Sequence, residues 1–298
     1  MVRLGRLLTA MVTPFNKRGE VDYEKAKMLA LSLLNSGSDG VVLSGTTGES
    51  PTLSLEEKLR LFAEVKSAVG KQGAVIANSG SYNTKESIEL TREAENLGVD
   101  AALLVVPYYN KPSQQGLLAH FQAIAKSTTL PCILYNVPSR TITNLDAETA
   151  VELSHIDNIV GLKEASGNLQ QIAEITNGVP SDFLLYSGND SDTFPILLIG
   201  GYGVISVASH LVGMQIKEMI TKATEGETAQ AEIIHHKLLP LVNALFITSN
   251  PIPIKYALTH VGFNVGNPRL PLTPPDEKTA TAIVAALKNY HINPPGLS

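Results

Sequence analysis

Eight short apolar runs recur along the first two thirds of the chain, and each precedes a stretch with helical spacing of its apolar residues. The runs cover residues 7–12, 41–43, 74–77, 101–106, 132–135, 159–162, 183–186 and 204–207. They are mainly apolar rather than alternating, as expected for parallel strands that are covered on both faces. Eight strand–helix units in succession predict an α/β protein with a closed (β/α)8 barrel, the TIM barrel.

An open, doubly wound sheet is the main alternative to the barrel. Such folds usually carry a glycine-rich fingerprint after the first strand, and residues 7–15 contain no glycine. After Met214 the strand-like runs stop, and residues 229–246, 253–261 and 276–290 have helical patterns. We therefore expect a catalytic barrel at residues 1–224 and a C-terminal helical appendage at residues 225–298.

Composition argues against several classes of function. The net charge of −5 is unlike the basic footprint of nucleic-acid-binding proteins. Cys132 is the only cysteine and lies in an apolar run, so we expect a small buried hydrophobe in a reducing compartment. No run approaches the roughly 20 apolar residues of a membrane span. We expect a cytoplasmic protein that binds neither nucleic acid nor membranes.

In a barrel the site lies at the carboxyl ends of the strands, so the residues that follow each run matter most. Lys163 directly follows the run 159–162. Partial burial would lower the pKa of its amine and make it a nucleophile; alternatively, the strand ends there and the lysine reaches water. Of the seven histidines only His210 follows a strand. We therefore expect neither a metal site nor a cofactor.

Two loops at strand ends are suited to binding carboxylates. The turn 45–50 combines backbone N–H groups with the hydroxyls of Thr46 and Thr47. Arg140 lies in a loop stiffened by Pro138, and its planar fork matches a carboxylate. A tight turn and a surface arginine are the alternative interpretations. Tyr135 ends the fifth run, where a phenol linked to other hydroxyls would relay protons.

Taken together, these motifs resemble the dihydrodipicolinate synthase family, within the class I pyruvate aldolases. The resemblance spans nearly the whole chain and rests on the order and spacing of the motifs. They are GTTGE at 45–49, PYYNKP at 107–112, YNVPSRT at 135–141, GLKEA at 161–165, SGND at 187–190, GVISV at 203–207 and NPIPIK at 250–255.

The resemblance implies a lyase that condenses pyruvate with L-aspartate 4-semialdehyde in the diaminopimelate route of lysine biosynthesis. Lys163 would form a Schiff base with pyruvate, which becomes an enamine and adds to the aldehyde. The implied hydroxyl relay consists of Thr46, Tyr135 and Tyr109, with Tyr109 reaching in from a neighbouring subunit. The protein would be a homotetramer built as a dimer of dimers.

The resemblance also implies the groups that bind the substrates. Thr46 and Thr47 would hold the pyruvate carboxylate, and Arg140 would hold the carboxylate of the semialdehyde. Gly188 and Ile205 would line the pyruvate pocket.

Many members of the family are inhibited by L-lysine in a polar cleft between subunits. The corresponding positions here are Ser50, Leu55, Lys58, Tyr82, Glu86 and Tyr108. Leu55 cannot form a side-chain hydrogen bond, and Lys58 would repel a second ammonium group. We expect weak or absent inhibition by lysine.

Two other functions remain open from the sequence. Sialic acid and 2-keto-3-deoxy sugar acid aldolases share the barrel, the lysine and the tyrosine, but they lack an arginine in the loop after the tyrosine. Arg140 therefore favours the semialdehyde. A non-catalytic barrel that binds a small carboxylate is the alternative of another class, and it would need neither Lys163 nor Tyr135.

Overall fold

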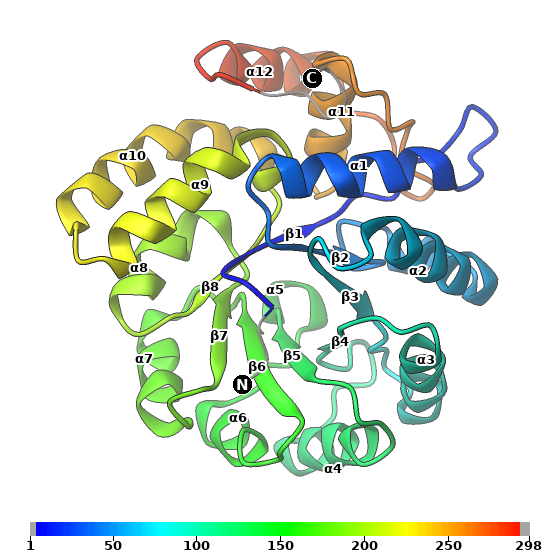
Figure 1. The fold of residues 1–298 in the computed structure, drawn as a ribbon, viewed down its shortest axis with the longest axis vertical. Helices are drawn as coiled ribbons and strands as arrows, with labels where there is room; N and C mark the ends of the chain where they lie inside the picture. Colours follow the sequence, from blue (N-terminus) through cyan, green and yellow to red (C-terminus); the bar gives the residue numbers. More distant parts are fainter. Residues whose placement is uncertain (1–3, 293–298) are drawn as a thin grey trace.

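The computed structural model describes residues 4–292 and confirms the closed parallel barrel (Figure 1). Each strand pairs with the next in sequence, and β8 closes the ring against β1. The strands are β1 Leu7–Ala10, β2 Gly40–Leu43, β3 Ala74–Asn78, β4 Ala101–Val105, β5 Cys132–Asn136, β6 Ile159–Glu164, β7 Leu184–Ser187 and β8 Gly203–Ser206.

Helices surround the barrel on its outer side, except the short α5 (Pro138–Thr141), which lies at the carboxyl ends of the strands (Figure 1). In order along the barrel they are α1 Tyr23–Asn35, α2 Leu55–Val69, α3 Thr84–Asn96, α4 Gln114–Ala125, α5 Pro138–Thr141, α6 Ala147–Leu153, α7 Leu169–Gly178, α8 Thr193–Leu198 and α9 Ser209–Thr224. Short 3₁₀ turns lie at Ser50–Thr52 and Asp190–Asp192. Helix α2 begins with the capping box of Ser54 and Glu57, which satisfies backbone N–H groups at its start.

The C-terminal helical part, also expected, consists of α10 Thr228–Leu245, α11 Ile252–His260 and α12 Glu277–Leu287. Helices α10 and α11 pack against α9, on the outside of the ring (Figure 1). The proposed division between residues 224 and 225 stays a prediction. No helix within residues 4–292 has the length and apolar character needed to cross a membrane.

Apolar side chains form two separate cores. One fills the barrel interior and includes Leu8, Ile76, Ile133 and Ile205. The other lies between the strands and the surrounding helices. A parallel barrel buries both faces of its strands in this way, which accounts for the mainly apolar runs.

Candidate active site

Lys163 lies inside a strand rather than after one. The sequence pattern ended the sixth strand at Leu162, which is wrong by two residues, because backbone pairing with β5 and β7 continues through Glu164. Lys163 is in register with Tyr135 on one side and Tyr186 on the other. Both tyrosines belong to the core inside the barrel. Since neighbours in register point to the same face, the lysine also points into the barrel.

The lysine amine is buried beside an aromatic ring. Lys163 is 6% exposed, and its Nζ lies 4.3 Å from the centroid of the Tyr135 ring. Tyr135 lines a cavity of about 340 Å³ at the carboxyl ends of the strands. Thr46, Tyr108, Arg140 and further residues of the loops line the same cavity: Glu49, Ser50, Pro51, Thr52, Asn78, Gly80, Val105, Val137, Thr141, Ser249, Asn250, Pro271 and Leu272.

The turn 45–50 is held by hydrogen bonds of its own backbone. The N–H of Glu49 donates to the Thr46 carbonyl at 3.1 Å, and the N–H of Ser50 donates to the Gly45 carbonyl at 3.2 Å. Within residues 4–292 the N–H groups of Thr46 and Thr47 make no hydrogen bond. The turn therefore retains backbone N–H donors of the kind that bind an anion.

Asn250 connects the turn to the arginine. Its Nδ2 donates to the Thr47 Oγ1 at 2.9 Å, and its backbone carbonyl accepts from the Arg140 Nη2 at 3.3 Å. The Thr47 hydroxyl therefore accepts one hydrogen bond and keeps its proton for another partner. The Oδ1 of Asn250 is buried and has no hydrogen-bond donor among the described residues. Such an orphaned acceptor beside a cavity suits a ligand that brings a donor.

Arg140 is placed by a helical turn that the sequence pattern did not show. Helix α5 begins at Pro138, a residue favoured at the first helical position, and Arg140 lies in this short segment. The Arg140 side chain lines the cavity together with Asn250, and it donates a hydrogen bond to the Asn250 backbone carbonyl. Its guanidinium and the turn 45–50 thus offer anion-binding groups at separate points of one cavity.

The packing of the last three strands determines where Gly188 and Ile205 lie. The Gly188 N–H donates to the Glu164 carbonyl at 2.7 Å, and a Cβ at this position would lie 2.6 Å from that of Ala165. Only glycine permits this approach to the end of β6. Ile205 belongs to the core inside the barrel, in the same cluster as Tyr135 and Tyr186.

Tyr109 does not join the cluster within a single chain. It is 92% exposed and has a φ of 75°, a backbone conformation that tyrosine rarely adopts. A relay through Tyr109 would therefore need a second chain.

The residues expected to form the lysine cleft are only partly brought together. The Tyr82 and Tyr108 rings meet edge to face with centroids 5.1 Å apart. Burial raises the pKa of Tyr108, and the charge of Glu86 adds to this effect. Burial lowers the pKa of Lys58, which Glu86 opposes. Ser50 lines the cavity with Tyr108, whereas Leu55 is 60% exposed at the start of α2.

Two buried carboxylates near Lys163 were missed in the sequence. Asp190 accepts hydrogen bonds from the Ser206 hydroxyl and from the N–H groups of Val207 and Ala208. Burial raises the pKa of Asp190, and the charge of Lys163 is among the influences that lower it. Glu164 points to the other face of β6, where Asn136 and Gln171 donate to it. Burial raises the pKa of Glu164 against these hydrogen bonds.

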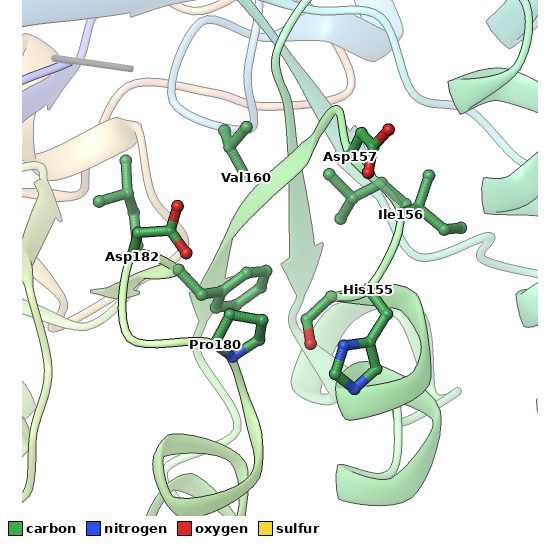
Figure 2. Close-up of a pocket in the computed structure, with 10 residues that line it drawn as sticks. His155, Ile156, Asp157, Val160, Pro180 and Asp182 are labelled. Atoms are coloured by element: carbon green, nitrogen blue, oxygen red, sulfur yellow. The ribbon is translucent and has the colours of Figure 1, made fainter. Parts of the chain in front are cut away.

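A second cavity lies at the opposite end of the barrel. Figure 2 shows its lining around the amino ends of β6 and β7, where His155, Asp157 and Asp182 surround a volume of about 380 Å³. Its lining contains no lysine, tyrosine or arginine. Among residues 4–292 no group of three or more histidine, cysteine, aspartate or glutamate side chains is arranged to hold a metal ion. The cavity at the amino ends of β6 and β7 therefore lacks the residue types that the carboxyl-end cavity combines in Tyr135, Thr46 and Arg140.

Comparison with known proteins points to one family. Residues 3–290 match the model described as the Dihydrodipicolinate synthetase family. A protein of Dehalococcoides mccartyi named 4-hydroxy-tetrahydrodipicolinate synthase is 62% identical over 295 residues, covering 99% of each chain.

Solved structures agree in fold and sequence. The dihydrodipicolinate synthase of Cyanidioschyzon merolae, described with lysine bound, has a TM-score of 0.95 at 48% identity, covering 96% of this chain and 98% of the other. The chloride-inhibited enzyme of Acinetobacter baumannii, described as complexed with pyruvate, has a TM-score of 0.93 at 40% identity, with coverage of 96% and 98%.

Proposed function

The chain belongs to the Dihydrodipicolinate synthetase family, and on that premise we propose that it is a 4-hydroxy-tetrahydrodipicolinate synthase. This activity condenses pyruvate with L-aspartate 4-semialdehyde in the diaminopimelate route of lysine biosynthesis. The observation that carries the proposal is the position of Lys163, buried against the ring of Tyr135, which lines a cavity together with residues of the turn 45–50 and Arg140.

The chemistry assigns one role to each group. The neutral amine of Lys163 attacks the ketone carbon of pyruvate, and loss of water leaves an imine. Loss of a proton from the methyl carbon gives the enamine, whose carbon forms a bond to the aldehyde carbon of the semialdehyde. The amino group of the semialdehyde then attacks the imine carbon, and the C–N bond to Lys163 breaks as the ring closes. Tyr135 and Thr46 move protons during these steps.

The binding groups match two carboxylates. Thr46 and Thr47, with free N–H groups and hydroxyls, would hold the carboxylate of pyruvate. The fork of Arg140 would hold the carboxylate of the semialdehyde. The orphaned Oδ1 of Asn250 suits the ammonium group of the same substrate, which brings three donors.

The assembly and location form part of the proposal. The exposure of Tyr109 and its strained backbone support a role in a neighbouring subunit's site, in a homotetramer built as a dimer of dimers. A single buried, unpaired cysteine is in keeping with the cytoplasm.

The choice of aldehyde tests this function against the related aldolases. With pyruvate present, the wild-type protein should turn over L-aspartate 4-semialdehyde and show no reaction with N-acetylmannosamine. Arg140→Leu should raise the KM for the semialdehyde by roughly 10²-fold, because a charge-assisted bidentate contact is lost. Turnover of N-acetylmannosamine alone would instead make the protein a sialic acid aldolase, and binding of pyruvate with no turnover of either aldehyde would favour the carboxylate-binding barrel.

A further inference from the structure

A buried ion pair joins the C-terminal helical part to the turn 45–50. The Nζ of Lys255 on α11 lies 2.6 Å from the Oε1 of Glu49, and each side chain is 1% exposed. Taking both charges out of water is costly, and such a pair seldom stabilises a fold more than apolar residues of the same size would. Stability alone therefore gives a weak reason for this pair.

The ion pair fixes Glu49, whose backbone conformation is strained. It has a φ of 59°, a left-handed conformation that is unfavourable for a residue with a side chain. Its second carboxylate oxygen accepts from the N–H of Arg269 at 2.8 Å. Both carboxylate oxygens of Glu49 thus accept hydrogen bonds from Lys255 and Arg269. These contacts fix the last part of the turn 45–50, which also contains Thr46 and Thr47.

Lys255 also contacts the loop after β1, which includes Thr13 and Phe15 and is hydrogen-bonded to the same turn. Its Nζ donates to the Thr13 carbonyl at 3.1 Å, and the Thr13 hydroxyl donates to the Gly48 carbonyl at 2.6 Å. The Phe15 ring centroid lies 4.1 Å from the same Nζ. The Lys255 amine therefore connects α11 to Glu49 and to Thr13, and Thr13 in turn holds Gly48.

The connection continues to α2 through Arg269. The guanidinium of Arg269 binds the Glu57 carboxylate, with the Nη1 donor at 2.8 Å, and donates to the Thr52 carbonyl at 2.7 Å. Together with the bond from Asn250 to Thr47, these contacts anchor the turn to the helical part at three points. A movement of α11 would therefore displace Thr46 and Thr47.

We propose that Lys255 is a positioning residue, which fixes the turn 45–50 through Glu49 and so sets the affinity for the carboxylate of pyruvate. This inference rests on the proposed function, because it takes the turn to be the pyruvate site. Lys255 itself stays away from the reacting atoms: its amine is fully engaged with Glu49, Thr13 and the Asn267 carbonyl. Burial lowers the pKa of Lys255, and the charge of Glu49 opposes that shift.

The test compares Lys255→Met with the double variant Glu49→Gln and Lys255→Met. The single variant leaves Glu49 buried without its counter-charge and is expected to be less stable, whereas the double variant is neutral and should fold. Borohydride reduction in the presence of pyruvate traps the imine on Lys163, and the pyruvate concentration for half-maximal trapping measures affinity. We expect that concentration to rise about ten-fold or more in the double variant, the effect of losing roughly one well-placed hydrogen bond.

Two readouts separate positioning from a general loss of structure. The KM for the semialdehyde should stay within about two-fold of wild type, because Arg140 is held by Asn250 rather than by Lys255. Ile283→Ala, a core variant in α12, and Lys222→Met, which breaks a surface ion pair with Glu227, serve as controls and should leave pyruvate affinity unchanged. The proposal is overturned if the folded double variant binds pyruvate like wild type, or if Ile283→Ala weakens it equally. A wild-type protein that traps no pyruvate would overturn the proposed function as well as this inference.

Discussion

Two tyrosines flank Lys163 in register, and their hydroxyls serve different purposes. Tyr186 donates its hydroxyl proton to the Gly5 carbonyl at 2.8 Å, which ties it to the chain before β1. Tyr135 lines the cavity, with the Lys163 amine against its ring. The same residue type in adjacent strands is therefore structural in one strand and available for proton transfer in the other.

Tyr135→Phe should lower kcat by about 10²–10⁴-fold, the usual contribution of a positioned acid or base. The ring stays against Lys163, so trapping of the pyruvate imine by borohydride should persist, at a lower rate. Tyr186→Phe is the matched control: it should keep kcat within a few-fold and reduce the free energy of unfolding by about 1 kcal/mol, since one hydrogen bond is lost. Steady-state kinetics of both variants decide the matter, and equal losses of kcat would contradict the division of roles.

Two hydrogen bonds fix the tautomer of the buried His210 ring, and protonation of this ring links folding stability to pH. Its Nε2 accepts from the Val12 N–H at 3.1 Å, and its Nδ1 donates to the Val207 carbonyl at 2.8 Å. The charged form would present a proton to the Val12 N–H, and burial lowers the pKa of His210 to about 4. In the unfolded chain the pKa is near 6.5. The unfolded state therefore binds more protons between these values.

Folding stability should consequently fall as the pH drops from about 6.5 to about 4, with His210 contributing up to about 3 kcal/mol of the loss. Above pH 6.5 that contribution is fully present. His210→Gln, which can still accept and donate a hydrogen bond, should flatten the dependence of unfolding free energy on pH in denaturant titrations. An unchanged slope in His210→Gln would contradict the contribution assigned to His210.

At the scale of single elements, strand β6 shows what a sequence pattern can and cannot predict. The apolar run at 159–162 identified the strand, but polar Lys163 and Glu164 hid its last two residues. They belong to the strand because Tyr186 and Ser187 of β7 continue the pairing. Alternation then sends Lys163 into the barrel and Glu164 outward to Asn136 and Gln171.

Contacts between distant elements lie beyond what the sequence could predict. Lys255 and Glu49 are 206 residues apart, and Asn250 and Thr47 are 203 residues apart. Neither pair has a local signature, since each depends on how the C-terminal helices pack on the barrel. The motif NPIPIK drew attention to residues 250–255 through a resemblance, while the contacts of Asn250 and Lys255 became visible only in the folded chain.

Helix α2 carries the prediction about L-lysine. Leu55 offers only an exposed apolar side chain, and Lys58 already lies near Glu86, where a second ammonium group would be repelled. L-lysine should therefore inhibit weakly or not at all. Initial rates measured with increasing L-lysine at fixed substrates check this directly. Half-inhibition at low micromolar lysine would show that other residues form the site.

At the scale of the whole molecule, the exposed Tyr109 predicts that one site uses two chains. Tyr109→Phe and Lys163→Ala should each lose most activity, by about 10²-fold or more for the tyrosine. Hybrid oligomers of the two variants should regain activity, because a subunit with intact Lys163 can take Tyr109 from its Lys163→Ala neighbour. Kinetics after joint refolding or co-expression measure this recovery. Hybrids no more active than the separate variants would place Tyr109 outside the site.

The whole barrel determines where Lys163, the proposed Schiff-base residue, lies. It buries the amine of Lys163 against Tyr135, which lines the cavity that also contains residues of the turn 45–50 and Arg140. Incubation with pyruvate and borohydride, followed by peptide mapping in a mass spectrometer, should place a reduced pyruvate adduct on Lys163 and leave the other lysines, Lys255 among them, unmodified. Lys163→Met should give no adduct. An adduct on another lysine, or none at all in the wild-type protein, would contradict the Schiff-base mechanism.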